Sequence, residues 1–202
     1  MVSNQVKISK GNSKMGAIQS VSLPAIKTCC QCKCHEKCYA HKLERLRPSV
    51  RNAYQHNLEL LQNDPNTYWL GVETAVAANR FFRFHVSGDI PDQEYLAKMV
   101  EVAERHPSCE ILCFTKRYEY VRDHIAENGE LPCNLHLILS AWDGLEMVNP
   151  YDLPEAHVRY RDGHTTATGK IVECAGNCTE CAITDGGCWT LQPGEKVVFN
   201  EH

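Results

Sequence analysis

Residues 81–116, FFRFHVSGDIPDQEYLAKMVEVAERHPSCEILCFTK, have the pattern of one strand–helix–strand unit. Within it, Phe82, Phe84 and Val86 alternate with Arg83 and His85, which is typical of a strand, and Ser-Gly-Asp ends that strand. Residues 91–107 place apolar side chains at helical spacing and charged ones on the opposite face. Residues 109–116 form an apolar run of strand length, as in a strand buried on both faces. The unit predicts two parallel strands joined by a helix.

The same alternation of strand and helix patterns extends along the chain. Further strands are expected near 16–23, 134–144, 156–161 and 196–202, and further helices near 39–61 (broken at Pro48), 64–78 (with Asp64 as N-cap) and 117–129. Alternating strands and helices favour a parallel sheet of βα units. We therefore predict an α/β fold with one domain, residues 1–202. Its mainly parallel sheet forms a partial barrel or an open layer, and residues 172–191 form a cysteine-rich metal-binding segment.

The composition is that of a globular protein with an unusual number of thiols. The chain has 202 residues, of which 43% are apolar and 23% are charged, and 12 are cysteines. It contains no stretch of 18 uncharged apolar residues, and its N-terminal sequence lacks the apolar region of a secretory signal. We therefore expect a cytoplasmic protein without membrane contact. Thiols stay reduced there, which favours metal ligation over disulfides.

Charge is distributed unevenly along the chain. Residues 1–53 contain ten lysines and arginines against two glutamates, whereas residues 54–202 carry a net negative charge. A basic segment can bind nucleic acid or an anionic cofactor. A basic helix face that offsets an acidic body is the preferred interpretation, because no aromatic-plus-basic recognition motif accompanies it. Nucleic acid remains an open alternative as a partner.

Four cysteines near the C-terminus form the clearest candidate metal site. Cys174, Cys178, Cys181 and Cys188 have the spacing C-x3-C-x2-C-x6-C and lie among glycines. Four thiolates satisfy the ligand count of a [4Fe–4S] cluster or of Zn²⁺. Structural zinc sites more often use two C-x2-C pairs with a long separation, so the continuous spacing favours iron–sulfur.

A second group of cysteines follows the first expected strand. Its members are Cys29, Cys30, Cys32, Cys34 and Cys38. Cys34 and Cys38 are four residues apart, which places them on one face of a helix. With Cys29 or Cys30 they give three ligands, and three ligands leave one iron of a cubane cluster open to a substrate. The alternative is a zinc site completed by His35 or His41.

Polar residues at the expected strand ends form a candidate small-molecule site. In parallel α/β folds ligands bind at the carboxyl ends of the strands. The candidates for binding a cofactor are Ser87, Gly88, Asp89, Lys116 and Ser140. Asp89 could accept from an ammonium group, Lys116 could pair with a carboxylate or phosphate, and the serines could bind a ribose. No sequence motif identifies a catalytic residue.

Several motifs resemble the phage "gene product 88" family across nearly the whole chain. They are NSKMGAIQSVSLP, KCYAHK, FFRFHVSGDI, FTKRYEYV, LPCNLHLILSAWDG, the CAGNC-x2-C-x6-CW run and GEKVVFNEH. The resemblance implies a protein of phages or mobile elements, located in the cytoplasm of the host bacterium. The family pattern of Thr-Cys, a short spacer and Cys-x3-Cys-Tyr-Ala selects Cys29, Cys34 and Cys38 as the first group of ligands. It implies no particular reaction.

The arrangement also resembles that of radical S-adenosylmethionine (SAM) enzymes. These place three cysteines after the first strand of a parallel βα barrel, and their second strand ends in a Gly-Gly-Glu-type motif that holds SAM. Here the next strong strand ends in Ser87-Gly88-Asp89, although the cysteine spacing differs from the familiar C-x3-C-x2-C. Similarity of arrangement alone does not establish a function.

The resulting functional hypothesis is an iron–sulfur protein with one or two [4Fe–4S] clusters. A redox enzyme of radical SAM type, with SAM or another small molecule at the strand ends, is favoured. The alternatives are a non-enzymatic electron carrier or redox sensor with a redox partner protein, and a zinc-stabilised module that binds nucleic acid or protein.

Overall fold

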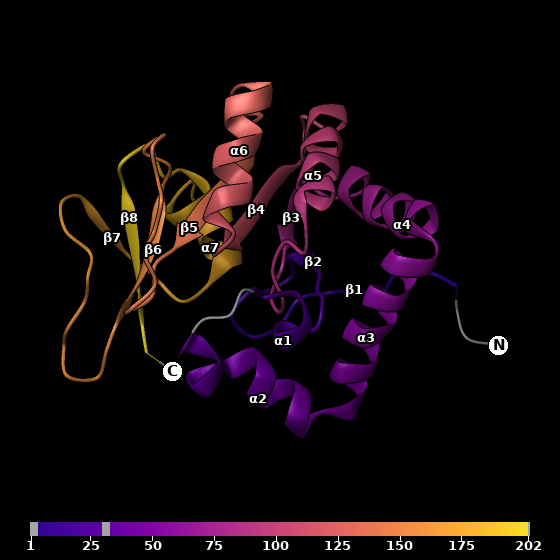
Figure 1. Cartoon of the computed structure of the whole chain (residues 1–202), viewed down its shortest axis with the longest axis horizontal. Coiled ribbons are helices and arrows are strands. Elements are labelled where there is room, and N and C mark those ends of the chain that lie inside the picture. Colours follow the sequence, from indigo (N-terminus) through magenta and orange to yellow (C-terminus); the bar gives the residue numbers. More distant parts are fainter. Residues whose placement is uncertain (1–3, 30–32, 202) are drawn as a thin grey trace.

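The computed structural model describes residues 4–29 and 33–201, which form an α/β fold around one eight-stranded sheet (Figure 1). The strands are β1 (Ile8–Ser9), β2 (Gln19–Val21), β3 (Phe81–Phe84), β4 (Glu110–Thr115), β5 (Leu135–Ser140), β6 (Glu155–Arg159), β7 (Ile171–Glu173) and β8 (Lys196–Asn200). The helices are α1 (Ala25–Thr28), α2 (Tyr39–Leu46), α3 (Pro48–Asn63), α4 (Pro65–Ala77), α5 (Gln93–Arg105), α6 (Tyr118–Asn128) and α7 (Cys178–Ile183), with 3-10 turns η1 (Lys33–Lys37) and η2 (Gly187–Trp189).

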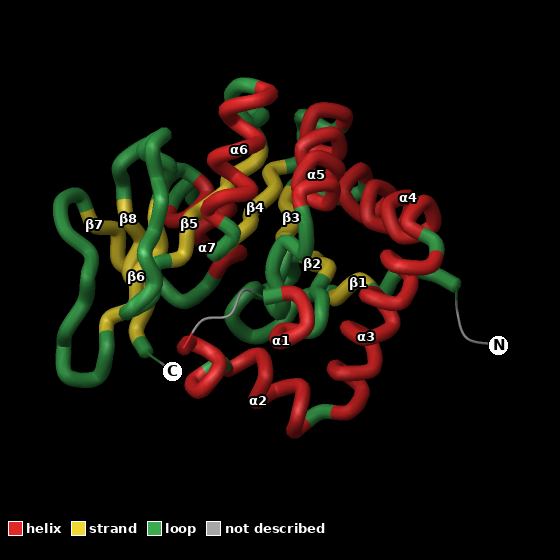
Figure 2. Tube along the Cα trace, viewed as in Figure 1, coloured by secondary structure: helices red, strands yellow, loops and turns green. Residues whose placement is uncertain are grey.

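The sheet is mainly parallel and open, which is one of the two forms that the sequence predicts. Its strand order is β1-β2-β3-β4-β5-β6-β8-β7, and only β1 runs antiparallel to its neighbour. From β2 to β6 the spatial order follows the chain order. Each crossover can therefore return on the same side of the sheet, and α4, α5 and α6 lie together in Figure 2.

The two faces of the sheet are covered by different parts of the chain. On what we call the helix face, Phe82, Phe84 and Cys113 pack with buried residues of α4, α5 and α6. On the opposite face, here the cysteine face, Leu112 and Ile138 pack with α7, η2 and the loop before β2. The crossover helices thus supply one half of the core, and the two ends of the chain supply the other.

Local sequence signals account for the helix boundaries that the sequence predicts. Pro48 begins α3 and separates it from α2, because proline fits the first turn of a helix but not its interior. Asp64 caps α4 as expected, accepting a hydrogen bond from the N–H of Thr67 at 3.1 Å. Within the described parts of the chain, no helix has both the length and the apolar character needed to cross a bilayer.

Candidate metal centre

The four C-terminal cysteines lie on a short turn–helix–turn segment after β7. Cys174 follows β7 directly, Cys178 and Cys181 lie in α7, and Cys188 lies in η2. Asn177 caps α7 by accepting from the N–H groups of Thr179 and Glu180, at 3.1 and 3.3 Å. The N–H of Cys174 donates to the carbonyl of Val198 in β8 at 3.0 Å. The segment is thereby fixed to the sheet at its beginning.

The four thiols share one partly buried region of the cysteine face. Burial raises the pKa of the Cys188 thiol to about 12, and the neighbouring Cys174 and Cys178 add to the increase. Burial likewise raises the pKa of Cys181, again with a contribution from Cys174 and Cys178. A bound metal cation would reverse the effect and stabilise the thiolates.

The loop before β2 binds the cysteine segment through hydrogen bonds to the first turn of α7. The Thr179 hydroxyl donates to the carbonyl of Met15 at 2.7 Å and accepts from the N–H of Ala17 at 3.2 Å. The N–H of Cys178 donates to the carbonyl of Lys14 at 2.9 Å. These residues belong to the NSKMGA motif, so the motif packs against the first turn of the cysteine helix.

Trp189 covers the same segment from the side of β3. Its indole N–H donates to the carbonyl of Cys178 at 3.2 Å, and its ring contacts Phe81 with a centroid separation of 5.1 Å. Trp189 is only 5% exposed. It therefore packs in the core of the cysteine face, next to the segment that carries the four thiols.

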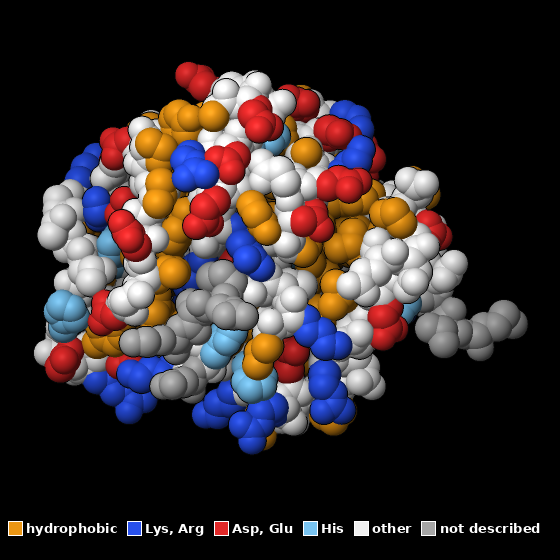
Figure 3. Space-filling view, viewed as in Figure 1, with side chains coloured by type: hydrophobic (Ala, Val, Ile, Leu, Met, Phe, Trp, Pro, Cys, Tyr) orange, Lys and Arg blue, Asp and Glu red, His pale blue; other side chains and the backbone are white. Residues whose placement is uncertain are grey.

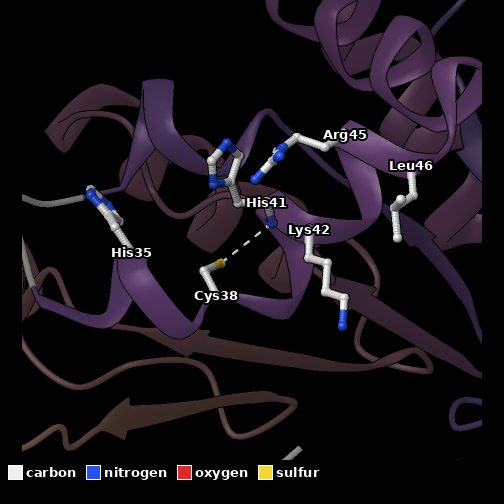
Figure 4. A pocket seen from close by; sticks show the side chains of 6 residues that line it. All are labelled: His35, Cys38, His41, Lys42, Arg45 and Leu46. Atoms are coloured by element: carbon white, nitrogen blue, oxygen red, sulfur yellow. Dashed lines mark hydrogen bonds between the residues drawn. The ribbon is translucent and has the colours of Figure 1, made fainter.

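Of the first cysteine group, Cys29 is the C-cap of α1, Cys34 lies in η1 and Cys38 precedes α2. Cys38 is the N-cap of α2, and its sulfur accepts from the N–H of His41 at 3.5 Å (Figure 4). Cys34 is disulfide-bonded, so it must be reduced before it can serve as a thiolate ligand. Cys30 and Cys32 lie outside the described residues. Whether Cys29 or Cys30 is the better candidate ligand therefore also lies outside what the structure describes.

An open, basic pocket of about 370 Å³ adjoins Cys38 (Figure 4). It is lined by His35, Cys38, His41, Lys42, Arg45 and Leu46. Within residues 4–29 and 33–201, no three His, Cys, Asp or Glu side chains are arranged to hold a metal ion.

Of the predicted strand-end residues, Asp89 and Lys116 contact each other, whereas Ser87 and Ser140 contact other parts of the protein. The Asp89 carboxylate accepts from the Thr115 hydroxyl at 2.6 Å and from the N–H of Lys116 at 2.9 Å. Burial raises the pKa of Asp89, whereas these hydrogen bonds oppose the increase. The Ser87 hydroxyl donates to Glu44 at 2.8 Å.

Glycine at position 88 permits the closest contact in this region. A Cβ at Gly88 would come within 2.7 Å of the Leu23 carbonyl and of the Thr28 hydroxyl. The Thr28 hydroxyl also accepts from the N–H of Asp89 at 3.1 Å. Since Thr28 precedes Cys29, the first cysteine loop starts at the carboxyl ends of β2 and β3. Ser140 ends β5, where its carbonyl accepts from the Tyr118 hydroxyl.

Tyr39 directly follows Cys38 at the start of α2 and contacts the segment after β3. Its hydroxyl donates to the carbonyl of Val86 at 2.7 Å, although the residue as a whole is 48% exposed. Loss of hydration raises the pKa of the Tyr39 hydroxyl, with smaller contributions from Cys38, Cys29 and Cys178, while Arg83 opposes them.

Arg83 and Tyr39 are two site residues that sequence reasoning does not select. Arg83 occupies a polar position in an alternating strand, where a solvated side chain is the usual expectation. The available signal is that Phe81, two residues earlier on the same face of β3, is apolar and partly buried. Tyr39 belongs to the KCYAHK motif, but its contact with Val86 joins distant parts of the chain.

Comparisons with known proteins give one family and no structural neighbour. The sequence model of the family "Gene product 88" matches residues 2–181. The "Gene 88 protein" of Mycobacterium phage L5 is 28% identical over 131 residues, which is 57% of this chain and 55% of that protein. The "Gene 88 protein" of Mycobacterium phage D29 has the same identity and coverage. The chain thus spans about half the length of these relatives. No solved structure matches.

Proposed function

The chain belongs to the gene product 88 family, and from that premise we propose that it is an iron–sulfur protein whose C-terminal cysteines hold a [4Fe–4S] cluster. The observation that carries the proposal is the gathering of Cys174, Cys178, Cys181 and Cys188 on the cysteine face of the sheet. A structural role as small apolar side chains would not require four thiols in one volume. A metal–sulfur centre requires several thiolates together.

The backbone around these thiols has the freedom that a cluster needs. Gly176 and Gly187 have φ angles of +85° and +61°, which side-chain-bearing residues rarely adopt. A Cβ at Gly187 would come 2.9 Å from the sulfur of Cys181. Glycine at this position lets the chain pass close to the sulfur. Such close passage leaves room for backbone N–H groups to face the sulfur atoms of a cluster.

The first cysteine group is proposed as a second cluster site at the strand ends. Cys29, Cys34 and Cys38 would supply three ligands once Cys34 is reduced. The fourth iron would then be open to a small molecule, with SAM as the first ligand to test. Ser87, Gly88, Asp89, Lys116 and Ser140 line the expected position of that molecule. This version of the proposal is a redox enzyme of radical SAM type in the reducing cytoplasm of the host.

Two further functions are the alternatives that the test must separate. A single closed cluster would indicate an electron carrier or redox sensor, which acts through a redox partner protein. A zinc-stabilised module that binds nucleic acid is favoured by one surface feature: Lys and Arg side chains gather along the edge that α2 occupies (Figure 3). The exposed basic residues of α2 and the start of α3 are Lys42, Arg45, Arg47 and Arg51.

The test is a metal and sulfide analysis of protein purified without oxygen and under reducing conditions. Iron, acid-labile sulfide and zinc are measured per chain in the wild type, C178S and C34S. C133S is the matched control, since Cys133 is exposed and lies in the loop before β5. A wild-type content of about four irons per chain that is lost only in C178S would support one closed cluster. A content of about eight irons, of which half is lost in C178S and half in C34S, would support two clusters. Zinc without sulfide would contradict both iron versions and leave the binding module.

A further inference from the structure

Ser20 and Arg83 form an adjacent pair on the cysteine face of the sheet. The register aligns Ser20 of β2 with Arg83 of β3, and Arg83 with Leu112 of β4. Aligned residues of parallel neighbours point to the same side of a sheet. Because Leu112 packs in the core of the cysteine face, Ser20 and Arg83 point toward the same side.

Both side chains carry a buried polar atom that lacks a hydrogen-bond partner. The Ser20 hydroxyl and the Arg83 Nε are buried without a partner in the described structure. Ser20 is 1% exposed. The Arg83 guanidinium lies over the Phe114 ring, 4.8 Å from its centroid, and forms no ion pair with any residue that the structure describes. Two unsatisfied donors on neighbouring strands indicate a missing acceptor.

The surroundings of the pair favour such an acceptor. The core of the cysteine face consists of Leu112, Ile138, Ala156 and Val197, and its Glu110 carboxylate is already paired with His136 at 2.6 Å. Arg83 is partly buried and its Nε is fully enclosed, and an enclosed charged donor without an acceptor is unfavourable. An anionic group close to Arg83 would remove this cost.

The C-terminal cysteines lie where such an anion is required. Trp189 contacts Phe81, which lies two residues before Arg83 on the same face, and Cys188 directly precedes Trp189. Cys188 therefore lies beside the part of β3 that carries Arg83.

We infer that Arg83 and Ser20 are the donor side of the metal–sulfur centre: they donate hydrogen bonds to its sulfur atoms and balance its negative charge. This inference rests on the proposed function of the C-terminal cysteines. A cluster with four thiolate ligands is an anion, and adding one electron makes it more negative. Arg83 therefore stabilises the reduced cluster more than the oxidised one and raises the reduction potential.

The experiment compares R83M, R83K and S20A with the wild type as purified holoprotein. Iron and sulfide are measured first, and the cluster is then titrated with dithionite and followed by electron paramagnetic resonance. R80M is the matched control, because Arg80 lies over an aromatic ring at 5.0 Å in the same way but its side chain is 72% exposed. We expect a more negative potential in R83M, smaller shifts in R83K and S20A, and an unchanged potential in R80M.

A second measurement applies even if R83M does not retain its cluster. Removal of iron with a chelator leaves an apoprotein in which the wild-type arginine has no counter-charge. Apo-R83M should therefore melt at the same or a higher temperature than apo-wild type, and the cluster should stabilise R83M less than the wild type. A wild-type potential in cluster-loaded R83M, or an apo-R83M less stable than apo-wild type, would overturn the inference alone. Absence of iron and sulfide from the wild type would overturn the proposed function and this inference together.

Discussion

The backbone of Gly16 lies directly against the hydroxyl of Thr179, so closely that a Cβ on Gly16 would come 2.2 Å from Thr179 Oγ1. This contact joins the loop before β2 to the first turn of α7, across 163 residues of sequence. It holds the cysteine segment on its face of the sheet. Two features require glycine at position 16: the close contact leaves no space for a Cβ, and the φ of +63° disfavours other residues.

We predict that G16A lowers the free energy of unfolding more than a glycine-to-alanine substitution that introduces only backbone strain. Gly163 is the matched control, since its φ is +87° and a Cβ there would have open space. G163A should cost about 1 kcal/mol of unfolding free energy. G16A should cost a further ~1–3 kcal/mol, because the added methyl group has to displace Thr179. Urea unfolding curves measure both, and equal losses would mean that the contact between the loop and α7 is not tight.

We predict that D89N weakens the connection between the ends of β3 and β4. The Asp89 carboxylate accepts from Thr115, Lys116 and the N–H of Ile90. An amide places an NH2 group against one of these donors, so a loss of about 1–3 kcal/mol is expected in urea unfolding. D92N is the control, because Asp92 is the N-cap of α5 and asparagine caps a helix about equally well. A similar small loss in both variants would argue against a structural role for the Asp89 carboxylate.

We predict that Glu44 fixes the helix after the first cysteine loop to the strand ends. Its Oε1 accepts from the N–H of Ala25 at 2.9 Å and from the Ser87 hydroxyl at 2.8 Å, and the residue is 8% exposed. E44Q keeps an oxygen that can accept both hydrogen bonds, whereas E44M leaves two buried donors without an acceptor. E44M should therefore be the less stable variant, by about 1–3 kcal/mol in thermal or urea unfolding. If E44Q loses as much as E44M, the negative charge and not the hydrogen bonding would be the important property.

The order of strands and helices could be predicted from the sequence because local signals determine it. Pro48 and Asp64 mark helix starts by their own backbone chemistry, and the apolar run of β4 is long enough to identify a buried strand. The strand β7 has three residues, of which two are exposed, so its sequence carries little apolar signal. Its place beside β8 depends on pairing with a distant strand.

The composition of the candidate site depended on information that a single sequence lacks. Spacing selects Cys174 and Cys178 as a candidate ligand pair, because ligands close in sequence are close in space. The pairing of Ser20 with Arg83 depends on a strand register, and a shift of one residue would turn Arg83 to the helix face. The contact of Tyr39 with Val86 depends on the packing of α2 against the segment after β3.

We predict that His85 makes the protein less stable in mild acid. His85 is 3% exposed, and its Nε2 lies 2.9 Å from the Tyr95 hydroxyl, which in turn contacts the Tyr68 hydroxyl at 2.6 Å. Burial lowers the pKa of His85 from 6.5 to about 3, and the positive charge of Arg83 adds to the decrease. The folded protein therefore keeps this imidazole neutral. The unfolded chain binds a proton at the ordinary pKa.

Stability decreases as the pH falls because the unfolded state takes up a proton that the folded state does not. The contribution of His85 to stability is complete above pH 6.5 and is lost as the pH falls from 6.5 toward 3. Between pH 7.5 and pH 5 the loss should be about 2 kcal/mol, at ~1.4 kcal/mol per pH unit below the ordinary pKa. Urea unfolding at both pH values should show this loss in the wild type and a loss smaller by about that amount in H85Q. H164Q, which removes an exposed histidine, is the control. Equal pH dependence in H85Q and the wild type would mean that the buried imidazole can be protonated in the folded protein, contrary to its position among Tyr95, Tyr68 and Arg83.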